Sequence, residues 1–175
     1  LTNEGGQITI RKSLTGSTLD WTIDQYGTTA SDARLRIFSG GTETNGINIK
    51  ENGYIGLGTS APTVRLQVTG DIIANSIAGS SDIRFKKDII PIANPLAKVL
   101  QLRGVNFNWN TAAFPQRMFS EKRTMGFIAQ EVEKVVPEIV QSENTTEGYK
   151  SVQYDKVVAL LVEAVKAQQK QINHW

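Results

Sequence analysis

The chain changes its residue pattern near position 80, and this change limits what it can fold into. Twelve of the 15 glycines lie in residues 1–80, where short segments alternate apolar and polar residues. Such alternation predicts strands that are covered on one face, and glycines between strands predict tight turns. Residues 81–175 instead carry apolar residues at helical spacing. We therefore place a domain boundary at 80/81, between an all-β part and an α+β part.

The β-rich part is expected to contain short strands and no helix before residue 70. The predicted strands are residues 7–11, 19–24, 33–38, 46–50 and 65–69. A segment with such short strands is too small to cover both of its faces well, so it needs partner surface. Threefold self-association would supply that surface, and a small monomeric sandwich is the alternative.

A glycine-rich run at 53–62 separates two of these strands. Its glycines at 53, 56 and 58 could suggest a phosphate-binding loop. However, no lysine follows in the required position, and Pro62 and a predicted strand follow in place of a helix. We interpret the run as turns.

The composition excludes several function classes. The net charge of +2 is too small to indicate nucleic acid as a partner. There are no cysteines, and the single histidine is His174, so we expect no cofactor and no metal site. No apolar run approaches the roughly 20 residues that span a bilayer, so no membrane insertion is expected.

After residue 80 the sequence predicts helices at 94–102 and 128–136, with a strand at 105–109 between them. Pro95 falls at a first-turn position and Pro137 ends the second helix. Residues 110–124 show no clean period and form a projecting loop in this interpretation. The apolar residues of this loop fit either a minor core or a partner surface; they are Phe114, Met118 and Phe119.

A long C-terminal helix is predicted at 154–172, where the chain has no glycine or proline. Apolar and polar residues at 3-4-3-4 spacing follow the a/d pattern of a coiled coil, and we call them the seam residues: Val158, Leu161, Val165, Gln168 and Ile172. An amphipathic helix that covers a local core is the alternative. Leu160 and Ala164 widen the apolar stripe, so part of the helix is expected to pack on its own domain.

Three blocks of the second part together resemble a known family. They are 81–89 (SDIRFKKDI), 126–138 (GFIAQEV through PE) and 149–154 (YKSVQY) with the helix that follows. In this order they resemble the intramolecular chaperone domain at the C-terminus of endosialidases, phage tail fibres and neck appendages, and of a membrane-bound myelin transcription factor. Residues 53–73 also look like the stalk segment that precedes this domain in fibre proteins.

The resemblance implies a homotrimer in which 81–175 folds first and then templates the β-fibre of residues 1–80. The long C-terminal helices would form a trimeric bundle, and the loop with Phe114, Met118 and Phe119 would grip the fibre. The resemblance also implies a virion tail fibre or a fibre adhesin on the bacterial surface, with host recognition through a glycan or protein receptor. Exposed Trp21 or Tyr26 would suit a sugar face, although both are also plausible as buried strand residues.

In this family the chaperone is often released by self-cleavage before the serine of the Ser-Asp motif. Carried onto this chain, the bond is Ser80–Ser81, the nucleophile is Ser81 and the base is Lys86, with no activity on external substrates expected. A lysine acts as a base only when burial or nearby positive charge lowers its pKa, and Arg84 is close enough in sequence to supply such charge. Lys87, the next residue after Lys86, is also close enough in sequence.

The alternative to a cleavage site is a plain turn. Ser80-Ser81-Asp82 is also a good helix-cap sequence, and the basic residues after it could form a solvated stretch. The segment departs from the family at Phe85, where a leucine is common. Endosialidase relatives also use a histidine in cleavage, and this domain has only His174 near its end.

Overall fold

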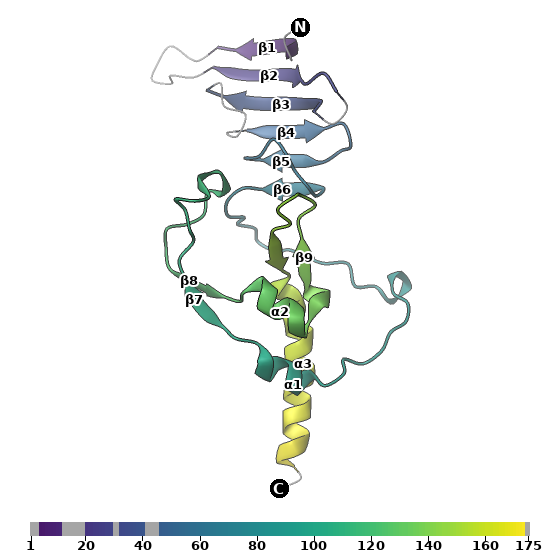
Figure 1. Cartoon of the computed structure of the whole chain (residues 1–175). Coiled ribbons are helices and arrows are strands. Elements are labelled where there is room, and N and C mark those ends of the chain that lie inside the picture. Colours follow the sequence, from purple (N-terminus) through teal and green to yellow (C-terminus); the bar gives the residue numbers. More distant parts are fainter. Residues whose placement is uncertain (1–3, 12–19, 30–31, 41–45, 174–175) are drawn as a thin grey trace. The chain divides into compact units, whose positions relative to one another are not determined.

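The computed structural model describes residues 4–11, 20–29, 32–40 and 46–173 (Figure 1). His174 lies outside the described residues. The chain forms two compact units, of which the first contains residues 1–73 and 110–120 and the second contains the remainder. The units therefore divide at 73/74, and the sequence boundary at 80/81 stays a prediction.

The first unit is built on one six-stranded sheet whose strands follow the chain order (Figure 1). The strands are β1 (Glu4–Ile10), β2 (Trp21–Tyr26), β3 (Arg34–Ser39), β4 (Ile47–Lys50), β5 (Ile55–Leu57) and β6 (Leu66–Val68). Neighbours from β1 to β5 pair antiparallel, whereas β5 and β6 pair parallel. A short 3₁₀ turn, η3 (Pro115–Arg117), belongs to the same unit.

The register of the sheet gathers most of its apolar residues on one face. Directly paired residues point to the same side of a sheet, and one row of such pairs crosses all six strands. The row consists of Ile8, Ile23, Ile37, Ile47, Leu57 and Val68. Trp21 and Leu35, two residues away along their strands, lie on the same face. We call this surface the apolar sheet face.

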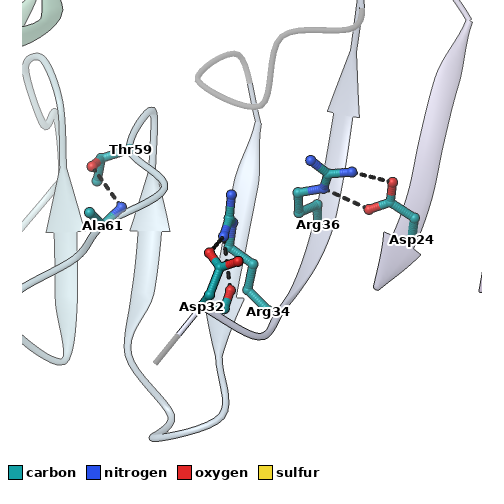
Figure 2. Close-up of polar contacts among 6 residues, drawn as sticks. All are labelled: Asp24, Asp32, Arg34, Arg36, Thr59 and Ala61. Carbon is teal, nitrogen blue, oxygen red and sulfur yellow. Dashed lines mark hydrogen bonds and ion pairs between the residues drawn. The ribbon is translucent and has the colours of Figure 1, made fainter. Parts of the chain in front are cut away.

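The opposite face carries buried polar residues. Asp24 and Arg36 are directly paired across β2 and β3, and Asp24 is only 2% exposed. Arg36 donates through Nε and Nη2 to the two carboxylate oxygens of Asp24, at 2.8 and 2.6 Å (Figure 2). The guanidinium groups of Arg34 and Arg36 lie 4.4 and 4.1 Å from the ring centre of Tyr26. The face is thus held by a bidentate ion pair and cation–π contacts.

The second unit contains helices and two-stranded sheets in alternation. Its elements are η2 (Ile83–Phe85), α1 (Pro95–Gln101), β7 (Val105–Phe107), β8 (Thr124–Gly126), α2 (Ala129–Val135), η4 (Pro137–Ile139), β9 (Val140–Ser142), β10 (Lys150–Val152) and α3 (Tyr154–Ile172). β7 pairs with β8 and β9 pairs with β10, both antiparallel. The sequence predicted α1, β7, α2 and α3, with Pro95 opening α1 and Pro137 following α2.

The core of the second unit lies where α2, η4 and α3 meet. Its buried residues are Val132, Val136, Ile139, Val157 and Leu160. Partly buried residues of α1 and its C-terminal cap pack against this cluster, because α1 lies beside α3. The cluster therefore fixes the helices of this unit through one small apolar centre.

The fold is mixed, with β-sheet in the first unit and an α+β arrangement with a long C-terminal helix in the second. Within the described residues no helix precedes Ile83, as the sequence predicted. A trimeric bundle and an all-β fibre stay predictions. None of the described helices combines the length and the apolar character needed to cross a membrane.

Candidate functional site

The predicted nucleophile and base lie within hydrogen-bonding distance of each other. The chain turns once through η2, and Lys86 Nζ donates to Ser81 Oγ at 2.9 Å. Both residues are exposed, as is Ser80. The structure thus brings together the nucleophile and the base that the family resemblance implied. Ser81 also contributes the nitrogen of the Ser80–Ser81 peptide bond.

Asp82 holds the turn between these two residues. Its carboxylate accepts from the Arg84 backbone N–H at 2.9 Å, which makes Asp82 the N-cap of η2. The same carboxylate accepts from Arg84 Nε at 3.0 Å and from Nη2 at 2.8 Å. The turn closes with Lys86 N–H donating to the Ile83 carbonyl at 3.0 Å. The cap role expected as an alternative for this segment is therefore present together with the Ser81–Lys86 contact.

The electrostatics of the turn are dominated by this ion pair. The side-chain hydrogen bond from Arg84, followed by the backbone hydrogen bond from the same residue, holds the pKa of Asp82 below its usual range. The pairing raises the pKa of Arg84. Because the guanidinium is bound by a carboxylate, Arg84 is a weaker source of the positive potential that the sequence suggested for activating Lys86.

The arrangement has the parts for acyl transfer but leaves them open to solvent. A serine hydroxyl becomes a nucleophile when a base accepts its proton, and Lys86 is placed to accept it in the neutral form. A lysine favours the neutral form when it is buried or lies near other cations. Full activity would therefore require cover over Ser81 and Lys86, which the described part of the chain does not supply.

The site lies in a long exposed segment. Between β6 and α1 the described chain has no helix or strand except η2. Residues 71–81 are all exposed, and Ile73 is 99% exposed. Ile72 and Ile77 are also largely exposed. The peptide bond between Ser80 and Ser81 is therefore accessible, and no residue that the structure describes covers the apolar side chains before it.

The seam residues of α3 lie on one exposed side of the helix. All five are exposed: Val158, Leu161, Val165, Gln168 and Ile172. Val157, Leu160 and Ala164 are buried against the second unit's own helices, as the sequence indicated for Leu160 and Ala164. One apolar side of the helix is thus buried in its own unit, and the second apolar side is exposed in the described part of the chain.

Residues 110–120 of the predicted loop, with Phe114, Met118 and Phe119, belong to the first unit, and residues 121–124 belong to the second. Met118 helps to line a hollow of about 530 Å³ on the apolar sheet face, together with Trp21, Ile47 and Leu57. Met118 has a left-handed backbone with φ of 49°, a conformation that costs a non-glycine residue roughly 1–2 kcal/mol. Phe114 and Phe119 are partly buried. The gripping role of the three residues stays a prediction.

Two contacts that the sequence did not predict join the second and third blocks. Tyr154 Oη accepts from the Phe127 N–H at 3.0 Å, and the two rings stack with centres 5.9 Å apart. Gly126 makes room for them, because a Cβ there would lie 2.4 Å from Tyr154 Oη. Gly126, Phe127 and Tyr154 lie in the blocks that carry the family resemblance, but their contact could not be predicted from their spacing in the sequence.

Comparison with protein families gives an independent result for this part of the chain. Residues 81–141 match the model of the family described as chaperone of endosialidase. The match begins at Ser81 and includes the first two of the three blocks. The search of curated proteins found no match. The chain therefore carries a C-terminal intramolecular chaperone domain of the endosialidase type.

Proposed function

We propose that the chain is the distal part of a homotrimeric fibre, in which the C-terminal chaperone drives trimerisation and folding of the β-region. The observation that carries this proposal is that the apolar sheet face is only partly covered. Ile8 is 63% exposed, and Ile10, Trp21, Leu35 and Leu66 are also exposed on this face. Single soluble proteins rarely expose contiguous apolar surface of this kind.

The burial of the two sheet faces is the reverse of the usual arrangement, in which apolar side chains are buried and polar side chains are exposed. On the polar face Asp24, Arg36 and Asn48 are buried, with Asn48 at 0% exposure. The apolar sheet face is only partly covered, because Ile8, Trp21 and Leu66 are exposed while the middle of its row is partly buried. The chain has therefore used its own residues to cover polar groups, and the apolar face needs cover from elsewhere. Other copies of the same sheet, packed around an axis, would cover it without further components.

The second unit also exposes apolar side chains that need cover, and these lie on α3. Val158 is 60% exposed and Leu160 is 3% exposed, although both are apolar and lie in the same two turns. An exposed apolar stripe at 3-4 spacing fits association with equivalent helices. The expected number of three copies rests on the family resemblance, and native mass spectrometry measures it.

Native mass spectrometry of the whole chain tests the proposal. The expected species has three times the chain mass of 19.2 kDa. Ile8→Lys would place a charge on the apolar sheet face, and Thr9→Lys, its matched control, would place the same charge on the opposite face of β1. We expect Ile8→Lys to reduce the trimer and Thr9→Lys to preserve it. A monomeric wild-type chain at high concentration would contradict the proposal.

We also propose that the protein belongs to a virion tail fibre or a bacterial surface fibre that meets a cell-surface glycan or protein. Tyr26 is a poor candidate for stacking on a sugar, because two guanidinium groups already lie over its ring. Trp21 lies on the apolar sheet face that other copies would cover. A glycan array probed with the whole assembled protein tests for the receptor, with Trp21→Ala expected to change assembly before it changes binding.

A second candidate function, self-cleavage, is favoured by the contact between Lys86 and Ser81. Lys86 would take the Ser81 hydroxyl proton as Oγ attacks the carbonyl carbon of Ser80. The C–N bond would break, the proton would pass to the Ser81 amine, and an ester would link Ser80 to Ser81 Oγ. Water would then hydrolyse this ester, which leaves a carboxylate on Ser80 and restores the hydroxyl. Adjacency of hydroxyl and carbonyl supplies part of the rate.

A denaturing gel after long incubation tests self-cleavage. Fragments that divide at Ser80–Ser81, identified by mass and abolished by Ser81→Ala, would support it. A chain that stays whole at 19.2 kDa would leave the chaperone role in place and remove the protease role.

A further inference from the structure

We propose that Asp82 and Arg84 form a positioning clamp that holds Lys86 Nζ against the Ser81 hydroxyl. This inference rests on the proposed self-cleavage, and it assigns to Arg84 a geometric role in place of an activating charge. Neither residue touches the Ser80–Ser81 bond in this assignment. Both act through Lys86, and they are positioning residues.

The clamp is a closed set of local bonds. The Asp82 carboxylate receives three hydrogen bonds from Arg84, one from the backbone N–H and two from the guanidinium. These bonds fix the first residues of η2, and the bond from Lys86 N–H to the Ile83 carbonyl fixes its end. Lys86 therefore leaves the turn at a defined point, from which Nζ reaches Ser81 Oγ at 2.9 Å.

Only local hydrogen bonds can position Lys86, because the neighbouring helices and strands lie many residues away in the sequence. η2 has only three residues and contains no buried side chain. No other described helix or strand lies between Val68 and Pro95. An exposed lysine has several rotatable bonds and many conformations. Without the clamp, the fraction of time that Nζ spends near Ser81 Oγ would fall, and the cleavage rate would fall in proportion.

A graded series of variants in the full chain tests the clamp. Asp82→Ala removes both cap and ion pair, whereas Asp82→Asn keeps a capping oxygen and loses the charge. We expect cleavage to slow about tenfold for Asp82→Ala and about threefold for Asp82→Asn and Arg84→Gln, with Arg84→Lys between Arg84→Gln and wild type. Asp88→Asn, the matched control, removes an acid from the same stretch and should cleave at the wild-type rate.

A double-variant experiment separates positioning from general structure. Lys86→Ala should be inactive and should recover cleavage with added methylamine as an untethered base. In that background Asp82→Asn should have no further effect, because no tethered lysine remains to be positioned. An equal loss with and without Lys86 would overturn the clamp and assign Asp82 a purely structural role, as would wild-type rates for Asp82→Asn and Arg84→Gln.

Amide hydrogen exchange gives a readout that does not depend on cleavage. In the full chain with Ser81→Ala, the amides of Arg84 and Lys86 should be protected, and Asp82→Ala should remove that protection while Asp88→Asn leaves it. If the wild-type chain never cleaves, the proposed self-cleavage fails and this exchange result alone decides the clamp. Unchanged protection in Asp82→Ala would overturn it.

Discussion

Leu160 and Leu161 are consecutive residues of α3, yet Leu160 is 3% exposed and Leu161 is 44% exposed. Consecutive helix residues point about 100° apart, because 3.6 residues make one turn. Leu160 faces the core of its own domain with Val157 and Ala164. Leu161 faces away with Val165 and the other seam residues. One side of α3 thus stabilises the fold of its own domain, and the other side is available for the proposed contact between copies.

The same truncation at these two positions should therefore have different effects. We expect Leu160→Ala to destabilise the chaperone domain by about 2–5 kcal/mol, because it removes buried methyl groups from the core. Leu161→Ala should leave the domain folded and weaken the trimer. Urea unfolding followed by circular dichroism measures the first effect, and light scattering measures the second. Equal trimer content in Leu161→Ala and wild type would argue against the seam.

The buried ion pair of the first unit makes a second prediction. Asp24→Ala would leave the Arg36 guanidinium buried without its carboxylate, a change that costs about 3–5 kcal/mol. Asp32→Ala is the matched control, because Arg34 also donates to the Asp32 backbone carbonyl, which the variant keeps. Its cost should be about 1 kcal/mol or less. The shift of the urea midpoint for each variant checks both values.

The sequence predicted some elements to within a residue and missed others for physical reasons. The helix at 154–172 was predicted in full, because a long segment without glycine or proline has few alternatives. The strand β5 was missed, because the run 53–62 was interpreted as turns only. Gly56 is needed inside this strand, since a Cβ there would lie 2.1 Å from the Thr59 carbonyl oxygen. The chain folds back after β5 through a turn in which Thr59 Oγ1 accepts from Ala61 N–H (Figure 2).

The candidate site was predictable only in part. Alternation showed that each strand has an apolar and a polar side, but it could not show that the chain covers the polar side. Ser81 and Lys86 were implied by resemblance, and the structure places them in contact. The pairing of Asp82 with Arg84 was missed, because the sequence of a charged segment does not show which side chains point toward each other. The sequence suggested that Arg84 could supply positive charge near Lys86, and the structure shows the Arg84 guanidinium paired with Asp82.

A third prediction concerns the close approach of two family blocks. Gly126→Ala would place a Cβ 2.4 Å from Tyr154 Oη, so the tyrosine must move and its bond to the Phe127 N–H must break. We expect a loss of about 1–3 kcal/mol in the stability of the chaperone domain. Gly104→Ala is the matched control, since a Cβ there meets no atom within 4 Å. Thermal unfolding of both variants measures the difference, and equal melting temperatures would contradict the prediction.

The clamp around Asp82 gives a prediction about pH. Hydrogen bonds from Arg84 lower the pKa of this carboxyl, so the folded chain holds Asp82 ionised at a pH where the unfolded chain would bind a proton. The contribution of the clamp is therefore complete above the ordinary pKa of aspartate, about 3.9, and is lost as the pH falls through the lowered value. Carbon NMR of the full chain with Ser81→Ala should show an Asp82 midpoint below the ordinary one. Arg84→Gln should raise that midpoint, while Lys87→Gln should leave it nearly unchanged, because the lysine is not bonded to the carboxylate in the structure. An Asp82 midpoint that does not respond to Arg84→Gln would show that the ion pair does not form in solution.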